Sequence, residues 1–564
     1  MVNSKTLWLA AAGLLFSLGA HAQAGIDDVW APVKVAVAPG DAYIGLSYLG
    51  NGELRYYNYG EQSDYPKNYR GNPENGSFYL ESKDYGLTWK QVRYSRDIPQ
   101  ADMRSPLSGE YVRLVNGGNA TYCIRTDGGI DGGRTVRKIS GIASIMLKPP
   151  VFIRGGRRIV VAAHGGVSPK GCYTYVSDDD GLTWTRSNTV TSPDHVKGGF
   201  HEGTRWNHGA VEPTVVELRD GRLWMIMRTA QDFHYEAFSE DGGLTWGESR
   251  PSVFWGTITM PTIGRLSDGR LLMLWCNTTP LPELKTADGV WDDVFTNRDV
   301  CHAAVSDDDG KTWHGCRELM MNPYRNDADF GSANNGVDLS VHQAQFVEVA
   351  PGKICAALGQ NSKIRSVVLF DVGWLLEKER VSDLSAGLDD WSVFNYRKGI
   401  VGHCSYNRVE GLKTVDGMLH VVYEKDDSLV SDVRGGVWNF PASKKGSVCL
   451  DICMPADDDG ISLLLNDHWM NPCDTVARHY SMAAVELSRK SLKIRDDSIH
   501  SVSLTWDDCS SGKGRVTVHV DGKKRSVIPI CKTTPLGISY IHLQADRPSA
   551  GVYVKSVKAV CSSF

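Results

Sequence analysis

Short segments in which apolar and polar residues alternate recur along the chain, separated by turns rich in glycine and aspartate. A period of two predicts β-strands that bury one face. Residues 209–246 contain the fullest copy of this arrangement, with Arg219, Asp220 and Gly221 as a tight turn. The strands predicted within it are residues 211–218, 223–228 and 235–238. The pattern predicts an antiparallel sheet that is repeated along the chain.

A second pattern, Ser-x-Asp-x-Gly-x-Thr-Trp, occurs four times, and its copies begin at Ser82, Ser177, Ser239 and Ser306. Serine and aspartate side chains can bond backbone groups inside a turn, glycine adopts a conformation that other residues resist, and tryptophan covers the space beneath. Each copy follows an alternating segment, so we expect it to join two strands. Repeats of this size are typical of propellers and solenoids.

These turns are Asp boxes, and through them residues 30–430 resemble the sialidase superfamily. The resemblance implies an all-β fold, with a six-bladed β-propeller in residues 23–433; seven blades stay open as an alternative. Five blades are expected at residues 33–89, 145–184, 209–246, 259–313 and 341–376. A sixth is expected to begin at residues 406–424, closed by residues 435–440 or by the N-terminal segment. The segments between blades, including residues 104–137, are expected to be functional loops.

Residues 434–564 alternate apolar and polar residues without an Asp box. This pattern predicts a C-terminal β-sandwich of the concanavalin or laminin-G type. It would either brace the propeller or bind sugar.

Charge and the N-terminal segment limit the partners and the location. The formal net charge is −5 and the sequence pI is about 6.4, which gives no support for a nucleic-acid partner. Lys5 precedes an apolar run at residues 7–18, and Ala20, His21 and Ala22 follow. This layout predicts a signal peptide at residues 1–22, cleaved after Ala22. We therefore expect a secreted or periplasmic protein without membrane insertion.

The chain has 13 cysteines, and the six in its last quarter leave room for one or more disulfides. The others lie in strand-like segments and are expected to be buried apolar residues. Neither a CxxC pair nor an HExxH motif occurs, so no metal or other cofactor is expected.

The most informative candidate residues lie in residues 209–246. In a propeller, the start of the innermost strand and the end of the next strand approach the same face. Glu212 and Arg228 occupy these two positions. The resemblance implies Glu212 as a catalytic carboxylate and Arg228 as a ligand of the substrate carboxylate. It implies the same binding role for Arg298, ahead of the following Asp box, because a guanidinium can donate two parallel hydrogen bonds.

A further landmark of the superfamily is a tyrosine nucleophile that opens the last blade. Tyr406 matches it, with Glu424 at the far end of the same predicted hairpin. Sialic acid carries a carboxylate on its anomeric carbon, which repels an anionic nucleophile. A neutral tyrosine that gives its proton to a nearby glutamate avoids this repulsion.

The chain also departs from the superfamily. The Arg-Ile-Pro strand and the acid aspartate are absent, and only Lys34 lies nearby; Arg70 and Asp64, in the loop before the first Asp box, could stand in for them. Other polar residues at predicted strand ends could fill the gap, although each taken singly is more often a satisfied polar group. His208, His342 and Gln360 are candidates for catalysis, and His164, Asn277 and Asn361 for substrate binding. This departure fits a divergent sialidase, with glycoside hydrolase family 181 as a candidate.

The expected function is that of an exported exo-glycosidase that removes terminal sialic acid from glycoprotein or mucin-type glycans. Sialylated glycans would be its partners. If Glu212 activates water directly, with a histidine or glutamine orienting it, the product would be inverted. Two alternatives stay open: another propeller glycosidase or a polysaccharide lyase acting on uronic-acid glycans, and a non-catalytic lectin.

Overall fold

The computed structural model describes most of the chain, and the architecture below refers to these residues. They are Ile26 and residues 28–37, 45–57, 77–94, 104–127, 134–165, 170–205, 209–282, 285, 298–327, 340–359, 364–385, 387–398, 408–455 and 460–563. Strands dominate, and the helices in this part of the chain are single turns. They are α2 (Val372–Leu375), α3 (Ala477–Tyr480) and α4 (Arg489–Leu492). The all-β prediction is confirmed.

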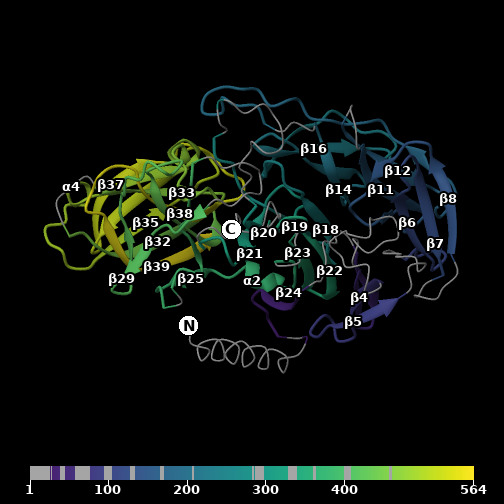
Figure 1. Cartoon of the computed structure of the whole chain (residues 1–564), viewed down its shortest axis with the longest axis horizontal. Helices are drawn as coiled ribbons and strands as arrows, with labels where there is room; N and C mark the ends of the chain where they lie inside the picture. The colour runs from purple at the N-terminus through teal and green to yellow at the C-terminus, as the bar shows by residue number, and fades with distance from the viewer. Residues whose placement is uncertain are drawn as a thin grey trace.

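Five antiparallel sheets form the blades of a propeller-like arrangement (Figure 1). The first has β2 (Leu46–Gly50), β3 (Glu53–Tyr57), β4 (Ser77–Ser82) and β5 (Lys90–Tyr94). The second has β10 (Val151–Ile153), β11 (Arg158–Gly165), β12 (Cys172–Ser177) and β13 (Thr185–Arg186), with β9 (Ser144–Ile145) beside β11. The third has β14 (Val211–Glu217), β15 (Leu223–Arg228), β16 (Phe233–Ser239) and β17 (Arg250–Trp255). The fourth has β18 (Thr262–Arg265), β19 (Leu271–Trp275), β20 (Val300–Ser306) and β21 (His314–Met321). The fifth has β22 (Gln345–Ala350), β23 (Lys353–Leu358) and β24 (Ser366–Asp371).

The fifth blade takes its outer strand from the N-terminal part of the chain. β1 (Val33–Val37) pairs antiparallel with β24, which corrects its expected place in the first blade. The first blade instead begins at β2, which turns into β3 at Asn51 and Gly52. Strand pairing between distant segments cannot be inferred from local alternation, because the period of two carries no partner information.

Residues 104–137 do not form the loop that we expected. They contain most of a three-stranded sheet of β6 (Tyr111–Asn116), β7 (Thr121–Thr126) and β8 (Arg134–Ser140). Val112, Leu114 and Cys123 from this sheet pack in one core cluster with residues of the second blade, including Val161 and Tyr175. This sheet lies between the first and second blades in the chain.

The four Asp boxes join the last two strands of their blades, as predicted. In the third blade, Asp241 Oδ1 accepts hydrogen bonds from Ser239 Oγ at 2.8 Å and from Thr245 N at 2.9 Å. The other three boxes repeat this scheme through Asp84, Asp179 and Asp308. These bonds satisfy backbone N–H groups of the turn that have no partner in the strand pairing of the sheet.

The C-terminal strands form two sheets that share one core cluster. One sheet contains β31 (Arg434–Ser443), β38 (Ile538–Ala545), β33 (Ile461–Asn466) and β34 (Ala483–Leu487), with β26 (Trp391–Ser392) beside β31. The other contains β32 (Lys445–Cys453), β35 (His500–Trp506), β36 (Arg515–Val520), β37 (Lys523–Pro529) and β39 (Val552–Ser563). Figure 1 shows these strands gathered beside the blades. We call residues 434–563 the C-terminal unit.

The expected sixth blade at residues 406–424 is not formed there. β29 (Lys413–Val415) and β30 (Met418–Val421) form a hairpin that pairs with β39, as β25 (Glu379–Ser382) also does. β27 (Asn395–Tyr396) pairs with β28 (Arg408–Val409), and residues 435–440 lie in β31. Pairing with the C-terminal unit therefore begins before residue 434. Asp416 and Gly417, both with positive φ, form the turn within the predicted hairpin, but the strand with which this hairpin pairs was not predicted.

A chain of buried hydrogen bonds joins the C-terminal unit to the fourth blade. His302 Nδ1 accepts from the Asn277 backbone N–H at 3.1 Å, so its Nε2 carries the proton and donates to Tyr540 Oη at 2.5 Å. The Tyr540 hydroxyl then donates to Glu318 Oε1 at 2.9 Å. Trp255 also stacks on His468, with ring centroids 4.2 Å apart. These contacts fix the C-terminal unit against the blades.

All 12 cysteines in the described part of the chain are free, so the possible disulfides of the last quarter are not formed there. Cys172, Cys276, Cys301 and Cys355 are buried, as expected. Within the ranges given above, no three His, Cys, Asp or Glu residues are grouped so that they could hold a metal ion. No helix in these ranges is long and apolar enough to cross a membrane.

Candidate active site

A bulge in the third blade positions Glu212. In β14 and β15, Val211 pairs with Arg228 and Thr214 with Ile226, so the register shifts between the two pairs. Glu212 lies in this gap with φ of 48°, a left-handed backbone that is costly for a residue with a side chain. Pro213, which follows it, has no N–H to donate to the ladder. Bulges of this kind re-aim side chains.

The carboxylate of Glu212 meets the guanidinium of Arg228. Arg228 Nη1 donates to Glu212 Oε2 at 2.8 Å, and the two side chains are 6% and 12% exposed. Burial alone would raise the pKa of Glu212. The charge and hydrogen bond of Arg228, followed by the charge that His164 carries when it is protonated at acid pH and by the charge of Arg298, outweigh burial and hold this pKa below 4.5. Glu212 is therefore an anion at neutral pH, which suits a base or an electrostatic role.

Arg298 is held beside the same site by two contacts. Its Nη2 donates to the Ile258 carbonyl at 2.6 Å, and its Nη1 lies 3.2 Å from His342 Nε2. Ile258 and Gln343, the residue after His342, both have positive φ, of 51° and 62°. One residue that contacts Arg298, Ile258, thus has a left-handed backbone, and so does Gln343, which follows a second contact. Glu212 is the corresponding residue at Arg228. Such strain is found at functional sites because the surrounding structure must maintain it.

His164 lies at the end of β11, within electrostatic reach of Glu212 and Arg228. Its Nδ1 lies 3.1 Å from the Gly165 carbonyl oxygen. Its Nε2 is buried and has no hydrogen-bond partner among the described residues. Burial lowers the pKa of His164 below 6.5, and the Glu212 charge opposes this only in part. A neutral imidazole with an unused nitrogen can accept or relay a proton.

The sequence reasoning missed two buried groups near this site. His234, in β16, is fully buried, and burial lowers its pKa to about 3, so it is neutral. A Cβ at Gly256 would lie 2.2 Å from His234 Nε2, so only glycine fits at that position. Burial also lowers the pKa of Lys148 to about 7, against the charges of Glu212 and Cys301. Nothing in the local sequence around Lys148 predicts that it is buried.

Six candidate site residues lie outside the described residues: Asp64, Arg70, His208, Gln360, Asn361 and Tyr406. The first described residue after Tyr406 in the sequence is Arg408, which binds the neighbour of Arg298. Arg408 Nη2 donates to Asp299 Oδ2 at 2.6 Å, and both side chains are only 2% exposed.

Two predicted residues have partners that we did not expect. The Asn277 side chain donates to the Asp467 carbonyl at 2.8 Å, and the Asn277 carbonyl accepts from Trp469 N at 2.9 Å, so this residue contacts the C-terminal unit. Glu424 is 76% exposed and lies 3.9 Å from Arg434. Neither contact follows from the sequence, because strand-end positions do not tell where the C-terminal unit packs.

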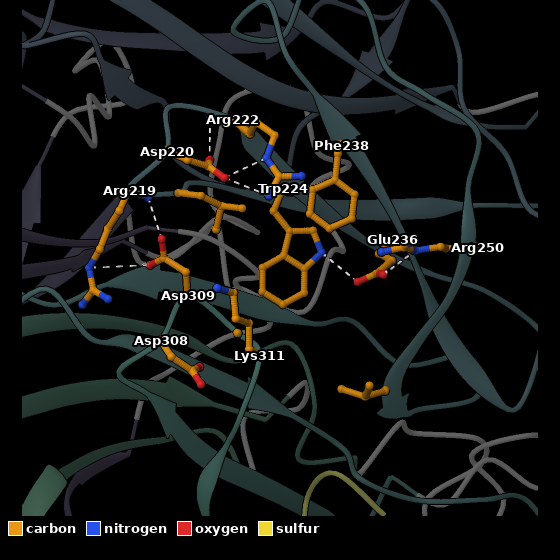
Figure 2. A pocket seen from close by; sticks show the side chains of 13 residues that line it. Arg219, Asp220, Arg222, Trp224, Glu236, Phe238, Arg250, Asp308, Asp309 and Lys311 are labelled. Carbon is orange, nitrogen blue, oxygen red and sulfur yellow. Dashed lines mark hydrogen bonds and ion pairs between the residues drawn. The ribbon is translucent and has the colours of Figure 1, made fainter.

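A separate surface cavity of about 580 Å³ lies between the third blade and the fourth Asp box. Figure 2 shows several contacts within its wall: Glu236 accepts from Trp224 and Arg250, and Asp220 pairs with Arg222. We place the candidate active site at Glu212 instead, because its charges are buried and its backbone is strained, whereas the charges of this cavity lie at the surface.

Comparisons with known proteins agree with the repeat. Residues 134–366, which include three of the four Asp boxes, match the family model described as a BNR repeat-like domain. No curated protein matches the chain.

Solved structures similar to the chain include several sialidases. One, a "Sialidase", is 14% identical with a TM-score of 0.29; the match covers 94% of this chain, which spans about half (52%) of that one. Trypanosoma rangeli sialidase in complex with sialic acid is 12% identical with a TM-score of 0.32, covering 93% of this chain and 90% of that one. The Hadza microbial sialidase Hz136 is 15% identical with a TM-score of 0.36, covering 61% and 66%. Because these TM-scores are all below 0.5, the function proposed below is argued from the residues of this chain.

Proposed function

We propose that this protein is an exported exo-glycosidase that hydrolyses terminal sialic acid from glycoprotein and mucin-type glycans. The observation that carries the proposal is the buried ion pair of Glu212 and Arg228, with Arg298, His164 and His342 grouped around it. A terminal sugar with its own carboxylate needs cations for recognition and a proton acceptor for hydrolysis. The group supplies both.

Arg228 and Arg298 would bind the carboxylate of the sugar. A guanidinium carries five N–H donors, so Arg228 can hold Glu212 and a substrate carboxylate at once. The fixed contacts of Arg298 with Ile258 and His342 would pre-organise it, which reduces the entropy lost on binding. Both arginines are almost fully buried, so the ion pairs they form are screened little by salt.

Two routes for hydrolysis are compatible with this group. In one, Tyr406 attacks the anomeric carbon as the glycosidic bond breaks, water then hydrolyses the bond between sugar and tyrosine, and the anomeric configuration is retained. In the other, Glu212 removes a proton from a water that attacks the anomeric carbon as the glycosidic bond breaks, and the configuration is inverted. The low pKa of Glu212 supports a base over an acid at this position. His164 or His342 would then orient the water and relay a proton to the leaving oxygen. Nuclear magnetic resonance spectra taken early in the reaction show which anomer is released first and so distinguish the two routes.

The proposal also includes a sixth blade, a C-terminal β-sandwich and export. The three-stranded sheet β6–β8 packs on the second blade and would be the sixth blade of the propeller. The two sheets of the C-terminal unit would form a β-sandwich that braces the blades, supported by their shared core and the bonds through Tyr540. Export would follow cleavage of the predicted signal peptide at residues 1–22. Membership of glycoside hydrolase family 181 stays a prediction.

The test is an assay of free sugar released from a sialylated glycoprotein and from a matched uronic-acid glycan. Release of sialic acid by the wild-type protein supports the proposal. An ultraviolet-absorbing product from the uronic-acid glycan, with no sialic acid released, would indicate a lyase and overturn it. Glu212→Gln separates an enzyme from a lectin, because turnover should fall at least 100-fold in an enzyme while glycan binding persists.

A further inference from the structure

A cavity of about 590 Å³ lies on the axis of the blade ring. The innermost strands of all five blades line it: β2, β10, β14, β18 and β22. Its volume falls in the range of pockets that hold small molecules. Much of its wall is apolar, and Phe152, Ile263 and Phe346 contribute to that wall.

One end of this axial cavity is buried and contains a single cation. Lys148, only 9% exposed, donates from Nζ to Thr262 Oγ1 and, at 3.2 Å, to the Ala344 carbonyl oxygen. Among the described residues, no carboxylate lies within ion-pair distance of its amine. The opposite end is partly exposed, and Glu217, Arg265 and Glu348 lie there.

A buried amine without a carboxylate partner must lose its proton or gain an anion, because an isolated buried charge is costly. The titratable groups that act on Lys148 are Glu212 in the third blade and Cys301 in the fourth. Burial lowers the pKa of Lys148 to about 7, so a substantial fraction of the amine is still protonated near neutral pH. A protonated Lys148 has one further N–H donor beyond its two hydrogen bonds.

We propose that the axial cavity binds a small organic monocarboxylate, whose charged head pairs with Lys148 and whose apolar body packs against Phe152, Ile263 and Phe346. The charge complements the buried cation and the body matches the apolar wall. The axial cavity adjoins the Glu212 site at Lys148, on which the Glu212 charge acts, but the proposal does not depend on the proposed hydrolase activity.

The test is isothermal titration of the whole protein with octanoate at pH 6, with octan-1-ol as the neutral analogue. We expect one octanoate site in the wild-type protein, at least tenfold weaker binding in Lys148→Met, and binding within a few-fold of wild type in Lys148→Arg. Octan-1-ol should bind equally to all three. Lys311→Met, at the outer cavity of Figure 2, is the matched lysine control and should bind octanoate normally.

Raising the pH from 6 to 9 should weaken octanoate binding to the wild-type protein, because the amine loses its proton, and should leave Lys148→Arg unchanged. Arg228→Met tests whether octanoate binds at the candidate active site instead. Loss of binding in Arg228→Met with retention in Lys148→Met would overturn the proposal, as would no octanoate binding at pH 6. If Lys148→Met does not fold, Phe346→Ala decides: retained wild-type affinity in that variant would also overturn it.

Discussion

Glu212 and Arg228 share a face of the third blade only because the ladder between them is broken. Val211 is the residue paired with Arg228, and residues paired across an antiparallel ladder point to the same side. In a regular strand, Glu212 would therefore point to the opposite side from Arg228. The bulge and the left-handed backbone at Glu212 turn its carboxylate to within 2.8 Å of Arg228 Nη1. The site depends on this local irregularity.

Removing Arg228 should damage both stability and activity. Arg228→Met leaves the buried carboxylate of Glu212 without its main partner, which typically costs about 3–5 kcal/mol. Denaturant unfolding measures this loss. The double variant Glu212→Gln/Arg228→Met should recover part of it, because the unpaired charge is gone. Equal stability of the single and double variants would show that the ion pair does not stabilise the fold.

The lowered pKa of Glu212 predicts how stability and activity depend on pH. It is lowered in the folded protein, because Arg228, His164 and Arg298 together outweigh burial, so its stabilising contribution is present above pH 4.5. That contribution is lost as the pH falls through the folded value. We expect the free energy of unfolding of Glu212→Gln to change less with pH below pH 5 than that of the wild-type protein. If Glu212 is the base, the acidic limb of kcat/KM also lies below pH 4.5, and a limb near pH 6 would contradict this assignment.

His164 should affect turnover more than binding. Its buried Nε2 has no hydrogen-bond partner in the described part of the chain, and its lowered pKa keeps it neutral. If it relays a proton, His164→Ala should lower kcat by about 100-fold with a smaller change in KM. His420→Ala, a histidine stacked on Tyr553 in the β30–β39 pair, is the control and should leave kcat unchanged. A change in KM alone would reduce His164 to a binding role.

Local sequence predicted the parts of the fold that depend on neighbouring residues. The hairpin of β14 and β15 follows from alternation and from Gly221, whose φ of 86° the turn requires. The Asp boxes follow from side chains that bond within their own turn. These features form from contacts a few residues apart, so the residue pattern is sufficient to predict them.

The parts that were missed depend on distant contacts. β1 closes the fifth blade, and the β29–β30 hairpin joins β39, although each has the alternation of any edge strand. Glu212 was named as a candidate from the sequence, but its bulge was not predicted. Lys148 gave no signal because its burial results from Thr262 and Ala344, which lie more than 100 residues away. Alternation specifies a buried face and leaves the identity of the partner open.

The Asp box of the third blade should stabilise the protein in a pH-dependent way. Burial raises the pKa of Asp241, but hydrogen bonds from Thr245, Ser239 and Leu244 outweigh it and lower this pKa to about 2. Its contribution is therefore present above pH 3.8 and is lost as the pH falls toward 2. Asp241→Ala should cost about 1–3 kcal/mol at pH 7 in denaturant unfolding. Glu240→Ala, its exposed neighbour, is the control and should change stability little.

The hydrogen-bond chain through Tyr540 should couple the C-terminal unit to the blades. Tyr540→Phe removes the acceptor of His302 and the donor to Glu318 while keeping the ring. Because both partners are left buried without that bond, we expect a loss of about 1–3 kcal/mol. Burial raises the pKa of Glu318, and loss of the hydroxyl should raise it further, so the destabilisation should be larger at pH 8 than at pH 5. Tyr423→Phe removes a partly exposed bond to Asp432 and serves as the matched control. Equal, small effects of the two substitutions in thermal unfolding would show that the interface does not depend on this chain of bonds.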